Sequence, residues 1–532
     1  MKRKWIRIAA AWLLTTVSLL SLGCDGKAPE NKPTDVRAFA SVSVARYADL
    51  ADAAAKAPGE LGARQALYFP AARYTVTADL RLDCPVQVAP GAVFEVAAGC
   101  TLTFADLFTA FDVQRRLFTG DGKVLIMDAV NPGYADWFCD GTEDDTAYLQ
   151  KGVDALYCLG LPDKTFVLDE IVIDTPTRIV SAGGMQIPVT AQSTVKNLFT
   201  VRSGDVTIQD LLIDMDNTQE GSAAIFLDTS AGDLKNINLT RIKFYWCSAG
   251  VIDTGTAAHG IDGIVLDNLS FHGAKDTQIV AVDNWKNVRI LEVEVTRRLY
   301  GGHTGINVNV MAYIFRHMSD VFIQNLDVNG EANRVNTAVP EEWYATHLDG
   351  SGMEFTDCHN VSLNRCLVEY VCGGGFWIKD CSGFRFEDVQ VFTHHNSGFV
   401  IENLTDSQLN GLKASPGADF AAITRDSFIM KNCRNVTVDG LMLRTCHGNG
   451  LYLESNEDLT FNNVNVLYNV RLYGLYDAGG NKNVQINGFS CKLRSAQKTD
   501  GVVSLTGEGV EIRGAVLQTV RQAELKEKGV YA

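Results

Sequence analysis

Residues 353–375 read MEFTDCHNVSLNRCLVEYVCGGG, and residues 376–398 read FWIKDCSGFRFEDVQVFTHHNSG. Both segments contain a short alternation of apolar and polar residues, a polar corner with Asn or Gly, a second alternation and a glycine turn. The pattern returns at Phe399, Phe428 and Leu451, so that successive starts lie 23, 23, 29 and 23 residues apart. Short strands separated by Asn, Asp and Gly turns at a regular spacing of about 20–30 residues are typical of a β-solenoid.

Equivalent positions of the repeat predict ladders of stacked side chains, because successive coils of a solenoid lie about 4.8 Å apart. The first position of each copy is large and apolar: Met353, Phe376, Phe399, Phe428 and Leu451. The position five residues later forms a second inward ladder: Cys358, Cys381, Leu404, Cys433 and Asn456. We therefore interpret these cysteines as buried, reduced packing residues. No CxxC or HxxxH spacing suggests a metal site.

The composition indicates a globular, acidic protein. The chain has 532 residues, a formal net charge of -16 and 46% hydrophobic residues, which excludes disorder, collagen and coiled coil. The acidic balance argues against nucleic acid as a partner, because a nucleic-acid binder normally presents a basic face to the phosphates. The sequence contains no apolar run of transmembrane length after residue 23.

The N-terminus has the pattern of an export signal. Four basic side chains within residues 1–7 precede an uncharged apolar stretch at 8–22, and Gly23 and Cys24 follow. This arrangement resembles a bacterial lipoprotein signal, which implies that Cys24 is lipidated and becomes the mature N-terminus. We therefore expect an exported protein of the bacterial cell envelope, anchored to a membrane only through that lipid.

A second stretch, residues 137–153 (WFCDGTEDDTAYLQKGV), resembles the motif that opens pectate-lyase-type domains in bacterial polysaccharide-degrading proteins and phage tailspikes. Together with the repeat, it resembles the right-handed parallel β-helix of the pectate-lyase and polygalacturonase superfamily. Asp144 or Asp145 can cap a following helix. Leu149 and Val153 would lie on one face of this helix, and we expect it to close the open end of the solenoid.

These patterns predict an all-β chain with six regions. We expect a signal peptide at 1–23, a lipoprotein tether at 24–36, a β-rich N-terminal lead-in at 37–130, an opening motif with a capping helix at 131–160, a single-stranded right-handed parallel β-helix at 161–520 with a long insertion at 329–352, and a tail at 521–532.

Alternation also predicts which side chains face outward. The outward position directly after each start holds Glu354, Trp377 and Tyr452, together with two aliphatic residues. Exposed aromatic rings can stack on sugar rings, or a turn can cover them. Two residues further on, Lys379, Glu402, Lys431 and Glu454 alternate in sign, which cross-strand pairing explains without any function.

The insertion at 329–352 is the largest departure from the repeat, and long turns on a rigid scaffold often carry functional sites. It contains Trp343, Tyr344, His347 and Asp349. Its end is loosely similar to the Asn-Thr-Asp-Gly motif of polygalacturonases. However, the coil that should carry their Asp-Asp pair reads Gly373-Gly374-Gly375. The inverting hydrolase mechanism is therefore unsupported at the usual positions.

Several chemistries stay open. Other carboxylates can replace the missing pair, on one coil or on neighbours that carry Glu369, Asp380 and Glu402. Alternatively, a base and a cation can drive β-elimination or epimerisation of a uronic acid. The catalytic candidates are Asp349, Glu354, His347, Lys379 and His395. The substrate-binding candidates are Trp343, Tyr344, Trp377 and Tyr452. We expect no cofactor, although a lyase would use Ca²⁺.

Two functions remain at the level of sequence. The first is an enzyme that binds and cleaves or modifies a polysaccharide, as a glycosidase or a polysaccharide lyase. The second is a non-catalytic glycan-binding or structural surface protein. An enzyme predicts at least two carboxylates, or a carboxylate and a base, converging in a groove beside the insertion. A binder predicts aromatic platforms there. The oligomeric state is open.

Overall fold

A computed structural model provides the structure of the chain. It describes residues 39–110, 116–129, 132–139, 144–216, 218, 221–255, 258–273, 276–296, 311–329, 352–371, 374–394, 396–415, 425–446, 448–470, 472–493, 502–506 and 509–518. The expected signal peptide, tether and lipidation residue Cys24 lie outside these residues, as does most of the predicted insertion.

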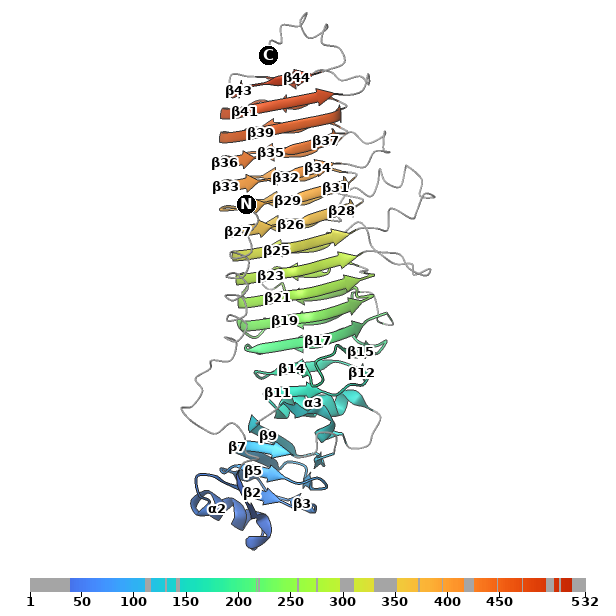
Figure 1. Cartoon of the computed structure of the whole chain (residues 1–532), viewed down its shortest axis with the longest axis vertical. Coiled ribbons are helices and arrows are strands. Elements are labelled where there is room, and N and C mark those ends of the chain that lie inside the picture. The colour runs from blue at the N-terminus through green and yellow to red at the C-terminus, as the bar shows by residue number, and fades with distance from the viewer. Residues whose placement is uncertain are drawn as a thin grey trace, which may run out of the picture.

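The described chain forms an elongated stack of parallel coils, as predicted (Figure 1). Two sheets run along the stack. The first, the narrow sheet, contains 13 strands, and the second, the wide sheet, contains 22 strands. All strand pairs between successive coils are parallel, for example Met353 with Phe376 and Phe376 with Phe399. The prediction of a parallel β-helix is confirmed.

The strands of the narrow sheet are short. They are β13 (Ile171–Ile173), β16 (Asn197–Val201), β18 (Ala223–Leu227), β20 (Ala249–Asp253), β22 (Ile279–Ala281), β24 (Tyr313–Arg316), β26 (Met353–Thr356), β29 (Phe376–Lys379), β32 (Phe399–Glu402), β35 (Phe428–Lys431), β38 (Leu451–Glu454), β40 (Leu475–Asp477) and β42 (Val503–Ser504).

The wide sheet includes several long strands that bend. Its strands are β10 (Gly133–Tyr134), β11 (Cys158–Leu161), β12 (Phe166–Leu168), β14 (Arg178–Ser181), β15 (Ile187–Ala191), β17 (Val206–Asp214), β19 (Leu234–Tyr245), β21 (Ile261–His272), β23 (Trp285–Thr296), β25 (Ser319–Asn329), β27 (His359–Asn364), β28 (Leu367–Val371), β30 (Arg385–Glu387), β31 (Gln390–His394), β33 (Thr405–Asn410), β34 (Lys413–Ser415), β36 (Arg434–Asp439), β37 (Met442–Cys446), β39 (Glu457–Val470), β41 (Lys482–Leu493), β43 (Val510–Arg513) and β44 (Val516–Gln518).

The predicted ladders fill the core. The first ladder is fully buried, and the rings of Phe376 and Phe399 stack with their centroids 5.4 Å apart and an angle of 11° between them. Cys358, Cys381 and Cys433 are buried, and every cysteine in the described part of the chain is free. Burial raises the pKa of the Cys433 thiol to about 12, so this side chain stays protonated and inert. The interpretation of these cysteines as reduced packing residues is confirmed.

The corners of the coils depend on residues that tolerate a left-handed backbone. Asn236, Asn287 and Asn360 have φ between 53° and 55°, a region that Asn adopts more readily than most residues. Their side-chain amides also donate to a carboxylate of the preceding coil, for example from Asn360 to Asp320 at 2.6 Å. The Asn, Asp and Gly turns of the repeat therefore hold the coils in register as well as turning the chain.

A smaller β-rich unit precedes the long stack and contains two sheets. One comprises β1 (Ala40–Ser43), β2 (Gln65–Phe69), β5 (Val86–Val88), β7 (Thr101–Ala110), β4 (Leu80–Leu82) and β9 (Lys123–Ala129), and the other comprises β3 (Arg73–Val76), β6 (Val93–Val96) and β8 (Phe118–Thr119). The helical segments are η2 (Val44–Arg46), α2 (Leu50–Glu60), η3 (Ala135–Phe138) and α3 (Asp145–Ala155).

Helix α3 lies where the N-terminal unit meets the long stack, as predicted (Figure 1). The side chain of Asp144 accepts hydrogen bonds from the backbone N–H groups of Thr146 and Ala147, so it is the N-cap. Leu149 and Val153 are buried on the face that packs onto the solenoid. Asp145 instead accepts hydrogen bonds from Tyr148 and Lys164, which confirms a structural role for the acidic pair.

Neither described helix combines the length and the apolar composition that a membrane span requires.

Candidate functional site

The residues predicted for the site fall into two groups. Trp343, Tyr344, His347, Asp349 and His395 lie outside the described residues, so their roles stay predictions. The other four, Glu354, Trp377, Lys379 and Tyr452, lie on the outer face of the narrow sheet. This face does not bring the four together, because two coils separate Trp377 from Tyr452 in the register.

Glu354 is held by a neighbouring cation. Its Oε1 accepts hydrogen bonds from Nε of Arg316 at 2.8 Å and from the hydroxyl of Thr356 at 3.3 Å. The Nη2 atom of Arg316 lies 2.7 Å from the same oxygen. Glu354 is therefore part of an ion pair on the sheet surface, and Arg316 occupies one of its carboxylate oxygens.

Trp377 is the register neighbour of Glu354, but a turn covers its polar edge. Its Nε1 is buried without a hydrogen-bond partner among the described residues. A Cβ added to Gly374 would lie 2.6 Å from that nitrogen, so the turn is already in close contact with the indole ring. Lys379 is exposed and pairs in register with Thr356 and Glu402. The interpretation of Trp377 as an aromatic residue covered by a turn therefore gains support.

Tyr452 belongs to a group of three tyrosines at the C-terminal end of this face. Its ring centroid lies 5.7 Å from that of Tyr476, which stacks on Tyr473 at 5.6 Å. The Tyr452 hydroxyl donates to Glu454, and burial together with that carboxylate raises the pKa of Tyr452 to about 12. The ammonium of Lys431 lies 5.6 Å from the Tyr452 ring centroid. We name Tyr452, Tyr473 and Tyr476 the tyrosine platform.

A different cluster of chemical groups lies on the outer face of the wide sheet, over β19, β21, β23, β25 and β28. Figure 1 shows these strands in the middle of the stack. There a groove of about 590 Å³ crosses the strands close to their C-terminal ends. Its acidic and basic lining residues are Lys243, Glu292, Glu294, Asp327 and Arg365. We name it the acidic groove.

Register aligns residues of the acidic groove and residues next to it into two ladders. One ladder runs through Lys243, Ser270, Glu294, Asp327 and Leu367. The other, two residues further along each strand, runs through Tyr245, His272, Thr296, Asn329 and Glu369. Register partners on adjacent strands lie about 4.8 Å apart, so carboxyl groups that are far apart in sequence become neighbours.

Strand alternation directs these groups outward. The residues between the two ladders, Phe271, Val295, Val328 and Val368, are buried in the core. Asn329 ends β25, two residues after Asp327, and is the first residue of the predicted insertion. The amide of Asn329 donates to Oε1 of Glu369 at 3.1 Å.

Asp327 is the electrostatic centre of the acidic groove. Burial, together with the neighbouring carboxylates Glu369 and Glu294, raises its pKa from an ordinary 3.8 to about 6. Its Oδ1 is buried and accepts no hydrogen bond from the described residues. Near neutral pH this carboxyl group therefore carries a proton for part of the time, which is the state that a general acid needs.

His272 completes the cluster. Its ring stacks on Tyr245 with the centroids 5.1 Å apart. Burial lowers the pKa of His272, Glu294 opposes that effect and Lys243 adds to it. The imidazole is therefore neutral near pH 7, able to accept or donate a hydrogen bond within the groove.

The acidic groove combines two carboxyl groups that are register neighbours, Glu294 and Asp327, with the imidazole of His272. None of its lining carboxylates, Glu292, Glu294 and Asp327, was predicted from the sequence; Glu369, which was, lies next to the groove. The usable signal is a shared pattern: residues 288–295 read VRILEVEV and residues 321–328 read VFIQNLDV. Glu294 and Asp327 occupy the seventh position of each and are register partners. Simple alternation fails to predict these outward residues because each strand bends just before them, at Glu292 and at Asn325.

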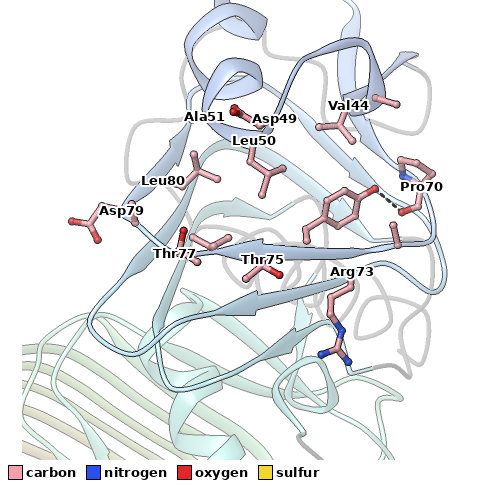
Figure 2. Close-up of a pocket in the computed structure, with 15 residues that line it drawn as sticks. Val44, Asp49, Leu50, Ala51, Pro70, Arg73, Thr75, Thr77, Asp79 and Leu80 are labelled. Atoms are coloured by element: carbon pink, nitrogen blue, oxygen red, sulfur yellow. Dashed lines mark hydrogen bonds between the residues drawn. The ribbon is translucent and has the colours of Figure 1, made fainter.

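The N-terminal unit contains a larger groove, of about 660 Å³, between α2 and β3 (Figure 2). Val44, Leu50 and Leu80 are among the apolar residues that line it. Its two carboxylates are engaged with the backbone: Asp49 accepts from Asp52 N–H and Asp79 accepts from Thr101 N–H. Although it is the larger of the two, this groove lacks free acid and base groups among its described lining, so we do not place the chemistry there.

Within the described ranges, no three His, Cys, Asp or Glu side chains are grouped closely enough to hold a metal ion.

Comparisons with known proteins find likeness in structure alone. No protein-family model matches the chain, and no curated protein matches its sequence. Tailspike protein 3 of bacteriophage CBA120 aligns at 10% identity with a TM-score of 0.43, over 73% of this chain and 62% of the tailspike. PfbA, a surface adhesin of Streptococcus pneumoniae, aligns at 9% identity with a TM-score of 0.38, over 73% of this chain and 93% of that chain.

One matched structure is an enzyme that acts on a polysaccharide. The A-module of mannuronan C-5 epimerase AlgE4 from Azotobacter vinelandii aligns at 12% identity with a TM-score of 0.28, over 72% of this chain and all of the module. These matched structures thus include an enzyme of polysaccharides and a surface adhesin. Because the identities and TM-scores are this low, the comparisons carry no argument about the activity of this chain.

The raised pKa of Asp327 predicts a measurable effect on stability. The folded pKa lies above the unfolded value, so protonation of Asp327 stabilises the fold at acid pH, and this contribution is lost as pH rises through about 6. Asp327→Asn removes the ionisable group. Relative to the wild type, the variant should gain about 1–2 kcal/mol in free energy of unfolding between pH 4 and pH 7, after allowance for residual solvent exposure.

Urea unfolding of the wild type and Asp327→Asn at several pH values measures this difference. Glu387→Gln is the matched control, because Glu387 lies on the same sheet outside the acidic groove. The raised pKa of Asp327 would be contradicted if Asp327→Asn gained the same free energy of unfolding at all pH values, or gained more at acid pH.

Proposed function

We propose that the chain is an enzyme that cleaves polysaccharide by hydrolysis in the acidic groove. The observation that carries this proposal is the convergence of Glu294 and Asp327 on adjacent strands, one of them with a pKa raised to about 6. Glycosidases need two carboxyl groups that differ in protonation beside the bond that breaks. Elongated grooves suit chain-like substrates, and this one crosses five strands of a rigid sheet.

The proposed roles follow from the electrostatics of the groove. Asp327 in its neutral form donates its proton to the glycosidic oxygen as the carbon–oxygen bond breaks. The carboxylate of Glu294 bonds to the anomeric carbon, and Asp327 then takes a proton from the water that releases the sugar. Register neighbours suit the separation of about 5–5.5 Å found in retaining enzymes, rather than the wider gap of inverting ones. His272 is placed to hold a hydroxyl of the sugar or the water.

Hydrolysis by this route predicts the effects of two substitutions. On a substrate found by screening polysaccharides for reducing-end release, Asp327→Asn and Glu294→Gln should each lower kcat by roughly 10²–10⁴-fold. The rate should fall as pH rises above about 6, because Asp327 loses its proton. Proton NMR of the first product should show the same anomeric configuration as the substrate.

Glu387→Gln and Glu354→Gln are the controls and should keep the wild-type rate. If the two groove variants were as active as the wild type, the acidic groove would not be the active site. An unsaturated product, detected by its ultraviolet absorbance, would indicate elimination and reject hydrolysis.

A second function, glycan binding without cleavage, is favoured by the tyrosine platform. Flat aromatic faces with charged groups at their edge, here Lys431 and Glu454, can pack against sugar rings and bond to their hydroxyls.

If the platform binds glycan, the double variant Tyr452→Ala and Tyr476→Ala should bind about threefold to tenfold more weakly in affinity electrophoresis. Val400→Ala, on the same outward ladder, should change nothing. If glycan in the gel slowed the double variant as much as the wild type, glycan binding by the tyrosine platform would be rejected.

We also propose that the protein is exported and anchored to the bacterial envelope through a lipid on Cys24. The basic and apolar N-terminal segment before Gly23 and Cys24 supports this proposal. Incorporation of labelled palmitate that persists in Cys24→Ser would reject it.

A further inference from the structure

The wide sheet bends at one position in a long series of successive coils, and the residue at the bend has a left-handed backbone. The bend residues of adjacent coils are neighbours, because the pairs on either side of them are in register, as Leu291–Gln324 and Val293–Leu326 are beside Glu292. We name these residues the bend row. With φ between 51° and 73°, they are Asp210, Arg241, Asn268, Glu292, Asn325, Arg365, Asp388, Gly411, Gly440, Asn463, Gly488 and Gly514.

Most of the bend row consists of residue types that accept this conformation. All but three of its residues are Asn, Asp or Gly, and the exceptions are Arg241, Glu292 and Arg365. A long side chain raises the energy of a left-handed backbone, because its Cβ approaches a carbonyl oxygen and it lacks the short polar group with which Asn and Asp bond locally. These three positions are therefore strained, and a contact of the side chain has to offset the strain.

Two of the three exceptions have such a contact within the bend row. Arg241 donates to both carboxylate oxygens of Asp210, from Nε at 2.6 Å and from Nη2 at 2.8 Å. The carboxylate of Glu292 accepts a hydrogen bond from the side-chain amide of Asn325. Both side chains thus link neighbouring coils, which is a structural reason for their presence.

Arg365 has no such contact. Its side chain is exposed, and its guanidinium forms neither a hydrogen bond nor an ion pair with the described residues. Its neighbour in the bend row, Asp388, accepts hydrogen bonds from Gln390 at 2.6 Å and from Lys413 at 3.1 Å instead. The fold therefore gains nothing from this side chain that offsets the strain at the bend.

Arg365 lines the acidic groove. It precedes Leu367 by two residues, and Leu367 is the register partner of Asp327. A strained backbone beside a groove is typical of a position that is kept for a ligand. The guanidinium suits that use, because its planar set of N–H donors matches the hydroxyl and carboxylate oxygens of sugars.

We infer that Arg365 is a substrate-binding residue of the acidic groove, and that its left-handed backbone is maintained for this contact and not for the fold. Its guanidinium donates hydrogen bonds to an oxygen of the sugar unit beside the one held by Glu294 and Asp327. This inference rests on the proposed function, since it concerns the same groove.

Thermal unfolding tests the first half of the inference. Arg365→Asn introduces the residue that occupies the bend row at Asn325, so it should raise the Tm of the full chain by about 1–2 °C. Arg241→Asn is the matched control. It makes the same substitution in the same row, but it breaks the ion pair with Asp210 and should lower the Tm.

Affinity electrophoresis tests the second half. The polymers are polygalacturonate, alginate, the carboxyl-reduced form of each, a neutral glucan and chitosan. Arg365→Asn should bind the polymers that the wild type binds about tenfold more weakly. Arg365→Lys should be intermediate, because it keeps the charge and loses the planar set of donors. Arg241→Asn removes the same charge outside the groove and should bind as the wild type does.

Each outcome has a distinct meaning. Weaker binding of only the acidic polymers identifies a carboxylate as the acceptor, and weaker binding of their reduced forms as well identifies a hydroxyl; both support the inference. Unchanged binding by Arg365→Asn, or a lower Tm, would overturn it and leave hydrolysis open to its own test. Weaker binding of a polymer that the wild type never cleaves would keep the inference and reject hydrolysis. No binding of the wild type to any of these polymers would overturn both.

Discussion

The in-register stacking of parallel coils is the constraint on which the rest of the structure depends. Each strand pairs with the equivalent strand of the next coil, so a residue at a given position lies directly over its counterparts. Inside, this produces continuous ladders of Phe and Cys. Outside, it produces rows of charged or aromatic groups, and a row of like charges is unfavourable unless something compensates it. In the acidic groove, Glu294 and Asp327 are such neighbours, and burial together with Glu369 and Glu294 raises the pKa of Asp327.

That arrangement explains why the acidic groove is a better functional candidate than the outer face of the narrow sheet, where the sequence predicted the site. On the narrow sheet, Glu354 has a guanidinium partner, and the Lys431 ammonium lies 3.4 Å from the Glu454 carboxylate, so charge is balanced locally. On the wide sheet, Glu294 and Asp327 are register neighbours, and the raised pKa of Asp327 means that its ionised form lowers folding stability. Stability given up at a rigid, concave position is typical of sites that bind or react. The fold supplies the rigidity, and the sequence of the outer rows supplies the chemistry.

The sequence predicted the core better than the site, and the reason is the bend in the long strands. Phe399 and Cys433 were placed correctly because regular alternation and a repeat of 23 to 29 residues surround them. In β23, Val288 and Ile290 face inward, but Glu292 has φ of 51° and reverses the alternation, so that Val293 and Val295 face inward next. Strict alternation from Val288 would therefore bury Glu294. Asn325 has the same effect before Asp327, with φ of 54°.

The most direct test of the central claim is the titration of the Asp327 carboxyl group itself. Protein labelled with carboxyl-¹³C aspartate is followed by NMR across acid and neutral pH, and the signal that disappears in Asp327→Asn identifies the residue. The structure predicts a midpoint near pH 6. A midpoint near the ordinary value of 3.8 would show that neither burial nor Glu294 and Glu369 act on Asp327, and it would remove the acidic groove as the catalytic site.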